Sequence, residues 1–201
     1  MSIRAVSSLD FTGKKVLVRC DFNVPLKSGQ ISDPHRIDAS LPTIRYILDH
    51  GGAAVLCSHV GRPKRRTPEL SLKPVAEYLS RALKIEVPLA PDCVGDATDR
   101  MVASLRDGQA LMLENLRFHP EEEANDPGFA QALARGKSVY LNDAFGTAHR
   151  AHASTAGVAR FVAEKAAGML MMRELEVLRA VTENASRPYV LIMGAQKCRI
   201  R

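Results

Sequence analysis

Short apolar blocks that alternate with stretches of helical period constrain this sequence more than any other feature. The blocks are bounded by Gly, Pro, Asp or Ser and cover residues 15–20, 53–57, 85–89, 110–113 and 138–141. Their apolarity is continuous rather than alternating, which is typical of strands buried on both faces of a parallel sheet. The sequence therefore predicts a mainly parallel sheet at the centre of the fold.

Stretches with helical spacing of apolar residues lie between the blocks. We expect helices over residues 35–50, 72–83, 96–108 and 126–136, with Ser71 as a cap of the second. After residue 155 the pattern predicts a long helical stretch that is broken or kinked near Gly168 and continues to residue 181. Strands and helices alternating in this way indicate an α/β fold, a Rossmann-like three-layer αβα arrangement with right-handed crossovers. Residues 183–188 are typical of a linker.

Composition excludes several other classes of protein. The 201 residues are 46% hydrophobic and 25% charged, which favours a globular chain over a disordered one. No apolar stretch approaches the roughly 18 residues of a membrane span, and the amino-terminal stretch lacks a secretory signal. We therefore expect a cytoplasmic protein with no membrane partner. The cysteines, at 20, 57, 93 and 198, stand singly, so we expect them to be reduced and mostly packed rather than bound to zinc or to one another.

The basic character of the chain is local. The net charge is +6, while residues 62–66 supply four basic side chains and residues 197–201 supply three. A charge run of this kind is more often a solvated surface than a docking site. Nucleic-acid binding through these two segments stays open as an alternative, but no aromatic residues accompany the charge, so we expect no nucleic-acid partner.

Polar side chains follow four of the predicted strands at their carboxyl ends, which is where ligands bind in parallel α/β sheets. The loops concerned are residues 20–25, 58–63, 114–119 and 142–152. Together with the start of the first helix they carry Asp21, Asn23, Arg36, His59, Arg62, Arg117, His149, Arg150 and His152. Guanidinium groups bind carboxylate and phosphate oxygens through paired hydrogen bonds. This edge of the sheet therefore predicts a site for a small phosphorylated acid.

Other kinds of site are less well supported by the residues. His149 and His152 have the spacing of half a metal site, but no third ligand stands at a useful distance in the sequence, so we expect no metal. His119 and the acidic run 121–123 are typical of loop surface. Neither a G-x-x-x-x-G-K-[ST] loop nor a G-x-G-x-x-G loop is present for a nucleotide. A serine nucleophile in a G-x-S-x-G turn is also lacking.

The same loops resemble signatures of the phosphoglycerate kinase family. The matching stretches are VRCDFNVP at 18–25, SHVGRPKRRTPELSLKPVAEYLS at 58–80, LENLRFHPEE at 113–122 and NDAFGTAHRAHAST at 142–155. They follow one another in order within residues 17–197, and the chain is identified as a member of the family by its amino-terminal, substrate-binding half. The resemblance implies reversible phosphoryl transfer between 1,3-bisphosphoglycerate and ADP, giving 3-phosphoglycerate and ATP, in glycolysis, gluconeogenesis or the Calvin cycle.

The resemblance also implies roles for individual residues. Those matching the substrate-binding positions of the family are Asp21, Phe22, Asn23, Arg36, His59, Val60, Gly61, Arg62, Arg117 and Arg150. Arg36 further matches the arginine that faces the phosphoryl group in transit. Lys197 matches a catalytic and nucleotide-binding lysine, and Arg201 stands, as a weaker match, where the family has a second lysine. Mg-ATP or Mg-ADP is the implied cosubstrate of the full enzyme.

Family members are about twice as long, because a nucleotide-binding domain follows the first domain. We expect a phosphoglycerate-binding domain over residues 1–168, an interdomain helix and linker over 169–187, and only the start of the nucleotide domain over 188–201. Residues 189–193 would form a strand with an exposed apolar edge. The chain alone would then bind 3-phosphoglycerate weakly with negligible kinase activity. It could be a non-catalytic binding fragment or be completed by a separate nucleotide-domain chain, and a truncation, a shifted frame and a split gene all remain open as origins.

Overall fold

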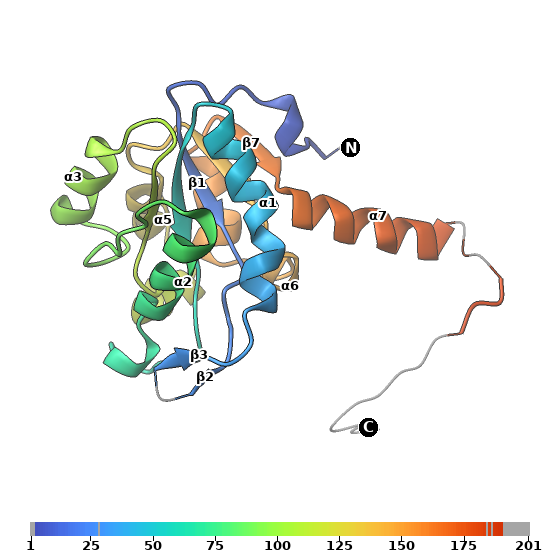
Figure 1. Cartoon of the computed structure of the whole chain (residues 1–201), viewed down its shortest axis with the longest axis horizontal. Coiled ribbons are helices and arrows are strands. Elements are labelled where there is room, and N and C mark those ends of the chain that lie inside the picture. The colour runs from blue at the N-terminus through green and yellow to red at the C-terminus, as the bar shows by residue number, and fades with distance from the viewer. Residues whose placement is uncertain (1–2, 28, 184, 186, 191–201) are drawn as a thin grey trace.

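A parallel sheet of five strands forms the centre of the protein (Figure 1). The computed structural model describes residues 3–27, 29–183, 185 and 187–190. Along the sheet the strands are β5 (Ala110–Met112), β4 (Ala53–Cys57), β1 (Lys15–Arg19), β6 (Val139–Asn142) and β7 (Glu164–Ala167). Four of them coincide with predicted blocks, so the parallel sheet is confirmed.

Helices cover both faces of this sheet. On one face, α1 (His35–Asp49) and α2 (Lys73–Leu83) pack over Val16 and Val18 of β1. On the other face, α3 (Asp96–Ser104) and α5 (Pro127–Ala134) pack over Leu17. Successive strand residues point to opposite faces, and both faces of the inner strands are buried, which is why residues 16–18 of β1 and 53–57 of β4 are continuously apolar. The predicted three-layer α/β fold is confirmed.

Side-chain oxygens bind backbone amides at the start of two helices, although Ser71, the expected cap of α2, stands one residue before its N-cap, Leu72. The Asp126 carboxylate accepts a hydrogen bond of 2.7 Å from the backbone N–H of Phe129 at the start of α5. The hydroxyl of Ser71 accepts one of 3.2 Å from the N–H of Lys73 at the start of α2. Both oxygens therefore satisfy amide groups that the helix itself leaves without a partner.

Substituting Asp126 with alanine is expected to lower the free energy of unfolding by about 1 kcal/mol, since the Phe129 amide loses its acceptor. Urea unfolding followed by circular dichroism measures the change. Asp107→Ala, the same substitution at an exposed loop residue, serves as the control. Equal losses in the two variants would contradict the capping role.

Two predictions of secondary structure were wrong. Residues 85–89 form only a single bridge between Leu89 and Met112, because Pro88 has no N–H with which to extend a ladder. Of the helical stretch expected after residue 155, the part after Gly168 is confirmed by α7 (Met169–Glu183), but the part before Gly168 is not helical throughout. It consists of a π-helical turn (Ala153–Gly157), a 3-10 turn (Val158–Arg160) and the edge strand β7.

Small elements complete the sheet domain. Strands β2 (Leu26–Lys27) and β3 (Gln30–Ile31) form an antiparallel hairpin, and α4 (Pro120–Glu123) and α6 (Phe145–Ala148) are single helical turns. Three 3-10 turns, η1 (Val6–Ser8), η2 (Pro68–Leu70) and η3 (Leu116–Phe118), lie in loops. In Figure 1 the hairpin and α6 lie toward the lower side of the molecule. Within the described ranges, no helix has the length and apolarity that crossing a bilayer requires.

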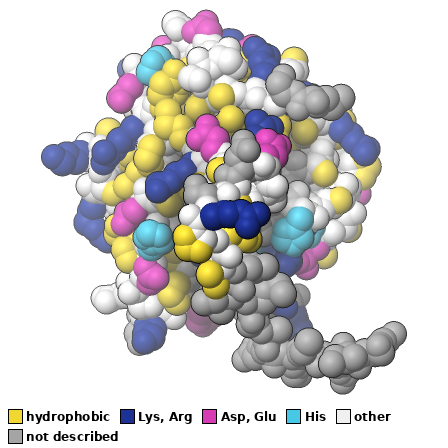
Figure 2. Space-filling model, turned by 90° about the vertical axis from the view of Figure 1, so that its right-hand side faces the viewer, with side chains coloured by type: hydrophobic (Ala, Val, Ile, Leu, Met, Phe, Trp, Pro, Cys, Tyr) yellow, Lys and Arg dark blue, Asp and Glu magenta, His cyan; other side chains and the backbone are white. Residues whose placement is uncertain are grey.

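The helix α7 (Met169–Glu183) leaves the body of the domain (Figure 1). Its first turn is held by Thr43, whose Oγ1 accepts from the N–H of Met169 at 2.9 Å, and by Asp143, whose Oδ1 accepts from that of Met171 at 3.2 Å. Farther along, Val177 and Leu178 are 54% and 44% exposed. Figure 2, which views this side, shows hydrophobic side chains at the surface among charged ones.

The residues after α7 bear on the expected apolar strand. Tyr189 and Val190 are exposed and are not part of a strand, while residues 191–193 lie outside the described residues. The start of α7 at Met169 agrees with the position at which we place the interdomain segment. The division into domains itself stays a prediction. Three cysteines, at 20, 57 and 93, are free and buried as expected, and Cys198 is not described.

Candidate functional site

A hollow of about 290 Å³ lies beyond the carboxyl ends of β1, β4, β5 and β6. It is lined by Asp21, Asn23, Arg36, His59, Gly61, Arg62, Arg117, Gly146, Thr147 and Arg150. Four arginines from four separate segments thus face one space. The structure brings together most of the residues that the sequence places at this edge.

Arg36 stands in the first turn of α1 and is paired with Asp21. Its Nη1 lies 2.5 Å from Oδ2 of Asp21, and the side chains are 55% and 14% exposed, respectively. The less exposed carboxylate therefore holds the more exposed guanidinium in place at the open side of the hollow. Gly146 keeps this corner clear, since a side-chain carbon there would lie 3.3 Å from the same carboxylate oxygen.

Arg117 is far more enclosed than Arg36, with 7% of its side chain accessible. Its Nη1 donates to the carbonyl of Gly61 at 2.9 Å, and its Nη2 lies 3.3 Å from Oε1 of Glu123. Burial lowers the pKa of Arg117, and the neighbouring Glu123 acts in the opposite direction. Two fixed contacts therefore orient the guanidinium before any ligand arrives, which reduces the entropy lost on binding.

The loop after β4 is tied to its neighbours through backbone groups. Gly61 has φ of 65°, a conformation that favours glycine, and its N–H donates to Oδ1 of Asn23 at 3.0 Å. The side-chain amide of Asn115 donates to the carbonyls of Val60 and Leu70, each at 2.9 Å. Gly61 is thus held in a fixed position at the rim, the edge of the sheet formed by the carboxyl ends of its strands.

Two residues from the family resemblance lie in the core rather than in the hollow. Phe22 is 0% exposed and Val60 is 3% exposed, and both belong to the core that packs on α1 and α2. The backbone N–H of Phe22 donates to the hydroxyl of Ser58 at 2.9 Å. In the structure these residues support the loops that carry Asn23 and Gly61, and their side chains do not line the hollow.

His59 lines the hollow and is only 4% exposed. Its Nδ1 stands 3.0 Å from Nη2 of Arg19. Burial, and then the positive charges of Arg19, Arg117 and Arg150, lower the pKa of His59 to about 2. The imidazole is therefore neutral at physiological pH.

The remaining predicted residues lie elsewhere. His149 is exposed and does not line the hollow, and Nδ1 of His152 lies 3.9 Å from Oε1 of the buried Glu122. Lys197 and Arg201 lie outside the described residues. The sequence analysis did not single out Gly146 and Thr147, which stand in α6, just before Arg150.

One group of side chains in the described residues has the composition of a metal site. Ligand atoms of Asp92, Cys93 and His119 lie within 4.8 Å of one another. However, Nε2 of His119 and Oδ1 of Asp92 are 2.6 Å apart, a hydrogen-bond distance and closer than the roughly 3.3 Å between two ligands of one zinc ion. Burial raises the pKa of the Cys93 thiol, which donates to the carbonyl of Glu114 at 2.9 Å. His119, expected at the loop surface, is thus a half-buried link between two loops.

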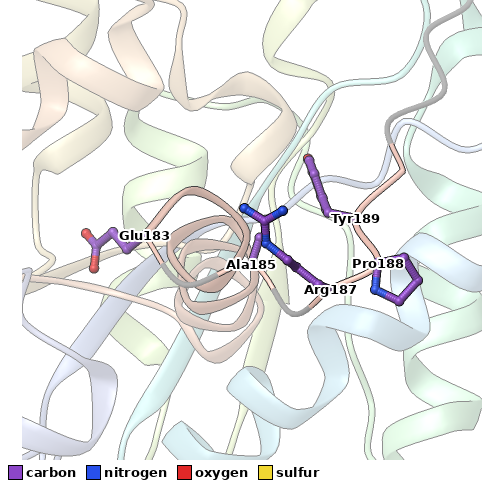
Figure 3. A pocket seen from close by; sticks show the side chains of 5 residues that line it. All are labelled: Glu183, Ala185, Arg187, Pro188 and Tyr189. Carbon is purple, nitrogen blue, oxygen red and sulfur yellow. The ribbon is translucent and has the colours of Figure 1, made fainter.

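Other hollows among the described residues carry fewer cationic side chains, at most two each. The one shown in Figure 3, of about 960 Å³, is lined by Glu183, Ala185, Arg187, Pro188 and Tyr189, all from the end of α7 and the segment after it. Another, of about 410 Å³, lies between β7, α6 and α7 and is largely apolar. Among the described residues, the hollow at the rim of the sheet is therefore the best candidate for an anion-binding site.

Comparisons with a family model and with individual relatives indicate the same family. The family model described as "Phosphoglycerate kinase" matches residues 6–200. A phosphoglycerate kinase of Chloroherpeton thalassium is 52% identical over 198 residues, which cover 98% of this chain and 50% of the relative. The cytosolic phosphoglycerate kinase of Triticum aestivum is 50% identical and is covered over 49% of its length.

Solved structures give the same result for the fold. The phosphoglycerate kinase of Coxiella burnetii superimposes with a TM-score of 0.83 at 37% identity, covering 93% of this chain and 47% of the other. That of Pyrococcus horikoshii gives 0.82 at 32% identity. The chain spans about half the length of the curated relatives it matches. By its sequence, over nearly its whole length, and by its fold, the chain belongs to the phosphoglycerate kinase family.

Proposed function

We propose that this chain supplies the acid-binding half of a phosphoglycerate kinase and holds 3-phosphoglycerate or 1,3-bisphosphoglycerate in the hollow at the rim. The reaction would be reversible phosphoryl transfer between 1,3-bisphosphoglycerate and ADP. The observation that carries the proposal is the convergence of Arg36, Arg62, Arg117 and Arg150 on one hollow of about 290 Å³. The cytoplasm is the proposed location, as the name of the wheat relative states for that protein.

The charge of the hollow favours a small ligand that is negative at both ends. Arginines that face one space repel one another unless anionic groups stand between them. Arg117 and Arg150 lie near the buried, neutral His59, whereas Arg36 stands more than half exposed at the open side. A triose acid with a phosphate at one end would place that phosphate near Arg117 and Arg150 and its carboxylate toward Arg36.

Phosphoryl transfer requires positioning and charge neutralisation more than a protein nucleophile. In the proposed reaction Arg36 neutralises charge that develops on the transferred group, and Asp21 keeps the guanidinium aimed at it. Mg-ATP or Mg-ADP would be the cosubstrate that donates or accepts the phosphoryl group. Lys197 and, more weakly, Arg201 are the nucleotide contacts that the family resemblance proposes.

Calorimetry with two ligands tests the proposal. The 201-residue polypeptide is expected to bind 3-phosphoglycerate and to bind ATP far more weakly. Arg62→Gln is expected to weaken 3-phosphoglycerate binding by about 10- to 100-fold, the effect of losing hydrogen bonds to a charged group. The control is Arg65→Gln, which removes the same charge from the same loop at an exposed residue that does not line the hollow.

Equal losses in the Arg62 and Arg65 variants would show that the loop attracts anions only through its total charge, and the proposed site would be wrong. Binding of ATP at the strength of 3-phosphoglycerate would also contradict it. Binding of 3-phosphoglycerate with no turnover in a coupled assay would assign the chain the narrower role of an acid-binding fragment.

A further inference from the structure

Arg19 carries a positive charge into the core at the end of β1. Its neighbours along the strand are apolar, and the residue is only 1% exposed. A buried charge costs several kcal/mol unless its donors are paired. Arg19 meets this requirement on three sides: Nε donates to Oγ of Ser154 at 2.8 Å, Nη1 donates to the carbonyl of Cys20, and Nη2 contacts Nδ1 of His59. The side chain is therefore held in one position.

Ser154 connects Arg19 to a buried carboxylate. Glu122, in α4, is 1% exposed, and its two oxygens accept from the hydroxyl and the backbone N–H of Ser154 at 2.5 and 2.9 Å. Because the Ser154 hydroxyl donates its proton to Glu122, its oxygen is left as the acceptor for Arg19. The hydrogen bonds thus run in one direction from the guanidinium to the carboxylate, and the negative charge offsets the positive one.

The contact with Arg19 decides where the proton of His59 resides. A guanidinium has only donors, so Nδ1 of His59 has to be the acceptor of the bond at 3.0 Å. In a neutral imidazole the proton is then on Nε2, the ring nitrogen directed away from Arg19. His59 lines the hollow. The ring therefore offers an N–H donor to whatever anion occupies that space.

We infer that Arg19 is a positioning residue: held by Ser154 and Glu122, it locks His59 as a neutral ring whose Nε2–H donates to the phosphoglycerate. This deepens the proposed function and rests on it for the identity of the ligand. Because His59 stays neutral, the four arginines alone set the positive charge of the hollow. The Nε2–H group of His59 adds a directional hydrogen bond without a further positive charge. Sequence reasoning missed Arg19 and Glu122, although a charged residue inside an apolar strand is itself a signal.

The charged groups that face His59 come from several elements: Arg19 from β1, Arg117 from η3, and Arg150 and His152 from the segment after α6. All four are positive or can become so, and each opposes protonation of the ring. Removing Arg19 alone takes away the nearest of these charges and the donor at Nδ1. Protonation of His59 should then become easier.

Nuclear magnetic resonance of the histidine ring nitrogens tests the lock without any ligand. In the native chain, His59 is expected to show the Nε2–H form unchanged between pH 5 and pH 8. In Arg19→Gln the ring should exchange between forms and take up a proton in this range. Ser154→Ala, which keeps the arginine, should broaden or shift the His59 signals, while Ser104→Ala, at an exposed serine, should not.

Binding of 3-phosphoglycerate gives the second readout. Between pH 8 and pH 5 the affinity of Arg19→Gln for 3-phosphoglycerate, relative to that of the native chain, is expected to rise about tenfold. The reason is that the charged His59 ring of the variant attracts the anion, and a bound anion that raises the pKa of the ring by one unit strengthens binding tenfold. Protonation of the ligand itself is common to both proteins and cancels in the ratio.

An Nδ1–H or doubly protonated ring in the native chain would overturn the inference, as would His59 signals that are unchanged in both Arg19→Gln and Ser154→Ala. If the native ring is locked as stated but 3-phosphoglycerate does not bind, the lock stands and the proposed function fails. The two conclusions can therefore be separated.

Discussion

Replacing Gly168 with alanine is expected to lower the free energy of unfolding by about 3 kcal/mol, the upper part of the range for an overpacked site. A methyl group at this position would lie 2.7 Å from Cβ of Asp143 and closer still to its carboxylate. Asp143 cannot easily move away, because its Oδ1 accepts from the N–H of Met171 and so holds the first turn of α7. The substitution would therefore strain the contact between Asp143, directly after β6, and the start of α7.

Gly13→Ala is the matched control for this prediction. Gly13 has φ of +67°, which an alanine tolerates poorly, but the space beside it is open. The substitution should cost about 1 kcal/mol from backbone conformation alone. Urea unfolding of both variants measures the difference, and a Gly168 variant no less stable than the Gly13 variant would show that α7 adjusts freely at its start.

Acidification from pH 7.5 to pH 5 is expected to destabilise the chain by about 2 kcal/mol through His59. Its pKa is lowered to about 2 in the folded protein, whereas the unfolded chain has the ordinary value near 6.5. Below pH 6.5 the unfolded state binds a proton that the folded state does not, so stability falls with pH at about 1.4 kcal/mol per unit. The loss of stability begins near pH 6.5, the pKa of the histidine in the unfolded chain, and would end only near pH 2, its pKa in the folded protein.

His59→Gln isolates this contribution, since a glutamine oxygen can still accept from Arg19 but does not titrate. The fall in stability between pH 7.5 and pH 5 should be smaller in the variant by about 2 kcal/mol. His152, whose pKa is also lowered by burial, acts in the same direction, and Asp143, whose pKa burial raises, acts in the opposite one. Both are present in the two proteins, so an identical pH dependence would refute the assignment to His59.

The central sheet could be predicted because its strands are buried on both faces. Lys15–Arg19 and Ala53–Cys57 have neighbours on each side and helices above and below, so residues 16–18 and 53–57 are apolar without a break. By contrast, Glu164–Ala167 forms the edge of the sheet and is only partly buried. An edge strand needs no apolar block, and this one therefore escaped prediction.

The arginines of the rim could also be predicted, because carboxyl ends of parallel strands meet at one edge. The sequence does not say which side chains turn inward from such loops. Phe22 fills the core beside the hollow, and Glu122 leaves the exposed acidic run to meet Ser154, 32 positions away. Contacts of this kind depend on how distant segments pack, and only the structure reveals them.

The alternation of β1 between two helical layers has a consequence for how the family can diverge. Val18 belongs to the core under α1 and α2, while the adjacent Leu17 belongs to the core under α3 and α5. A change of side-chain volume at one position is compensated by partners that the other never meets. Each layer can therefore accumulate its own exchanges over generations, at its own pace, while the strand backbone between them keeps the rim loops in register.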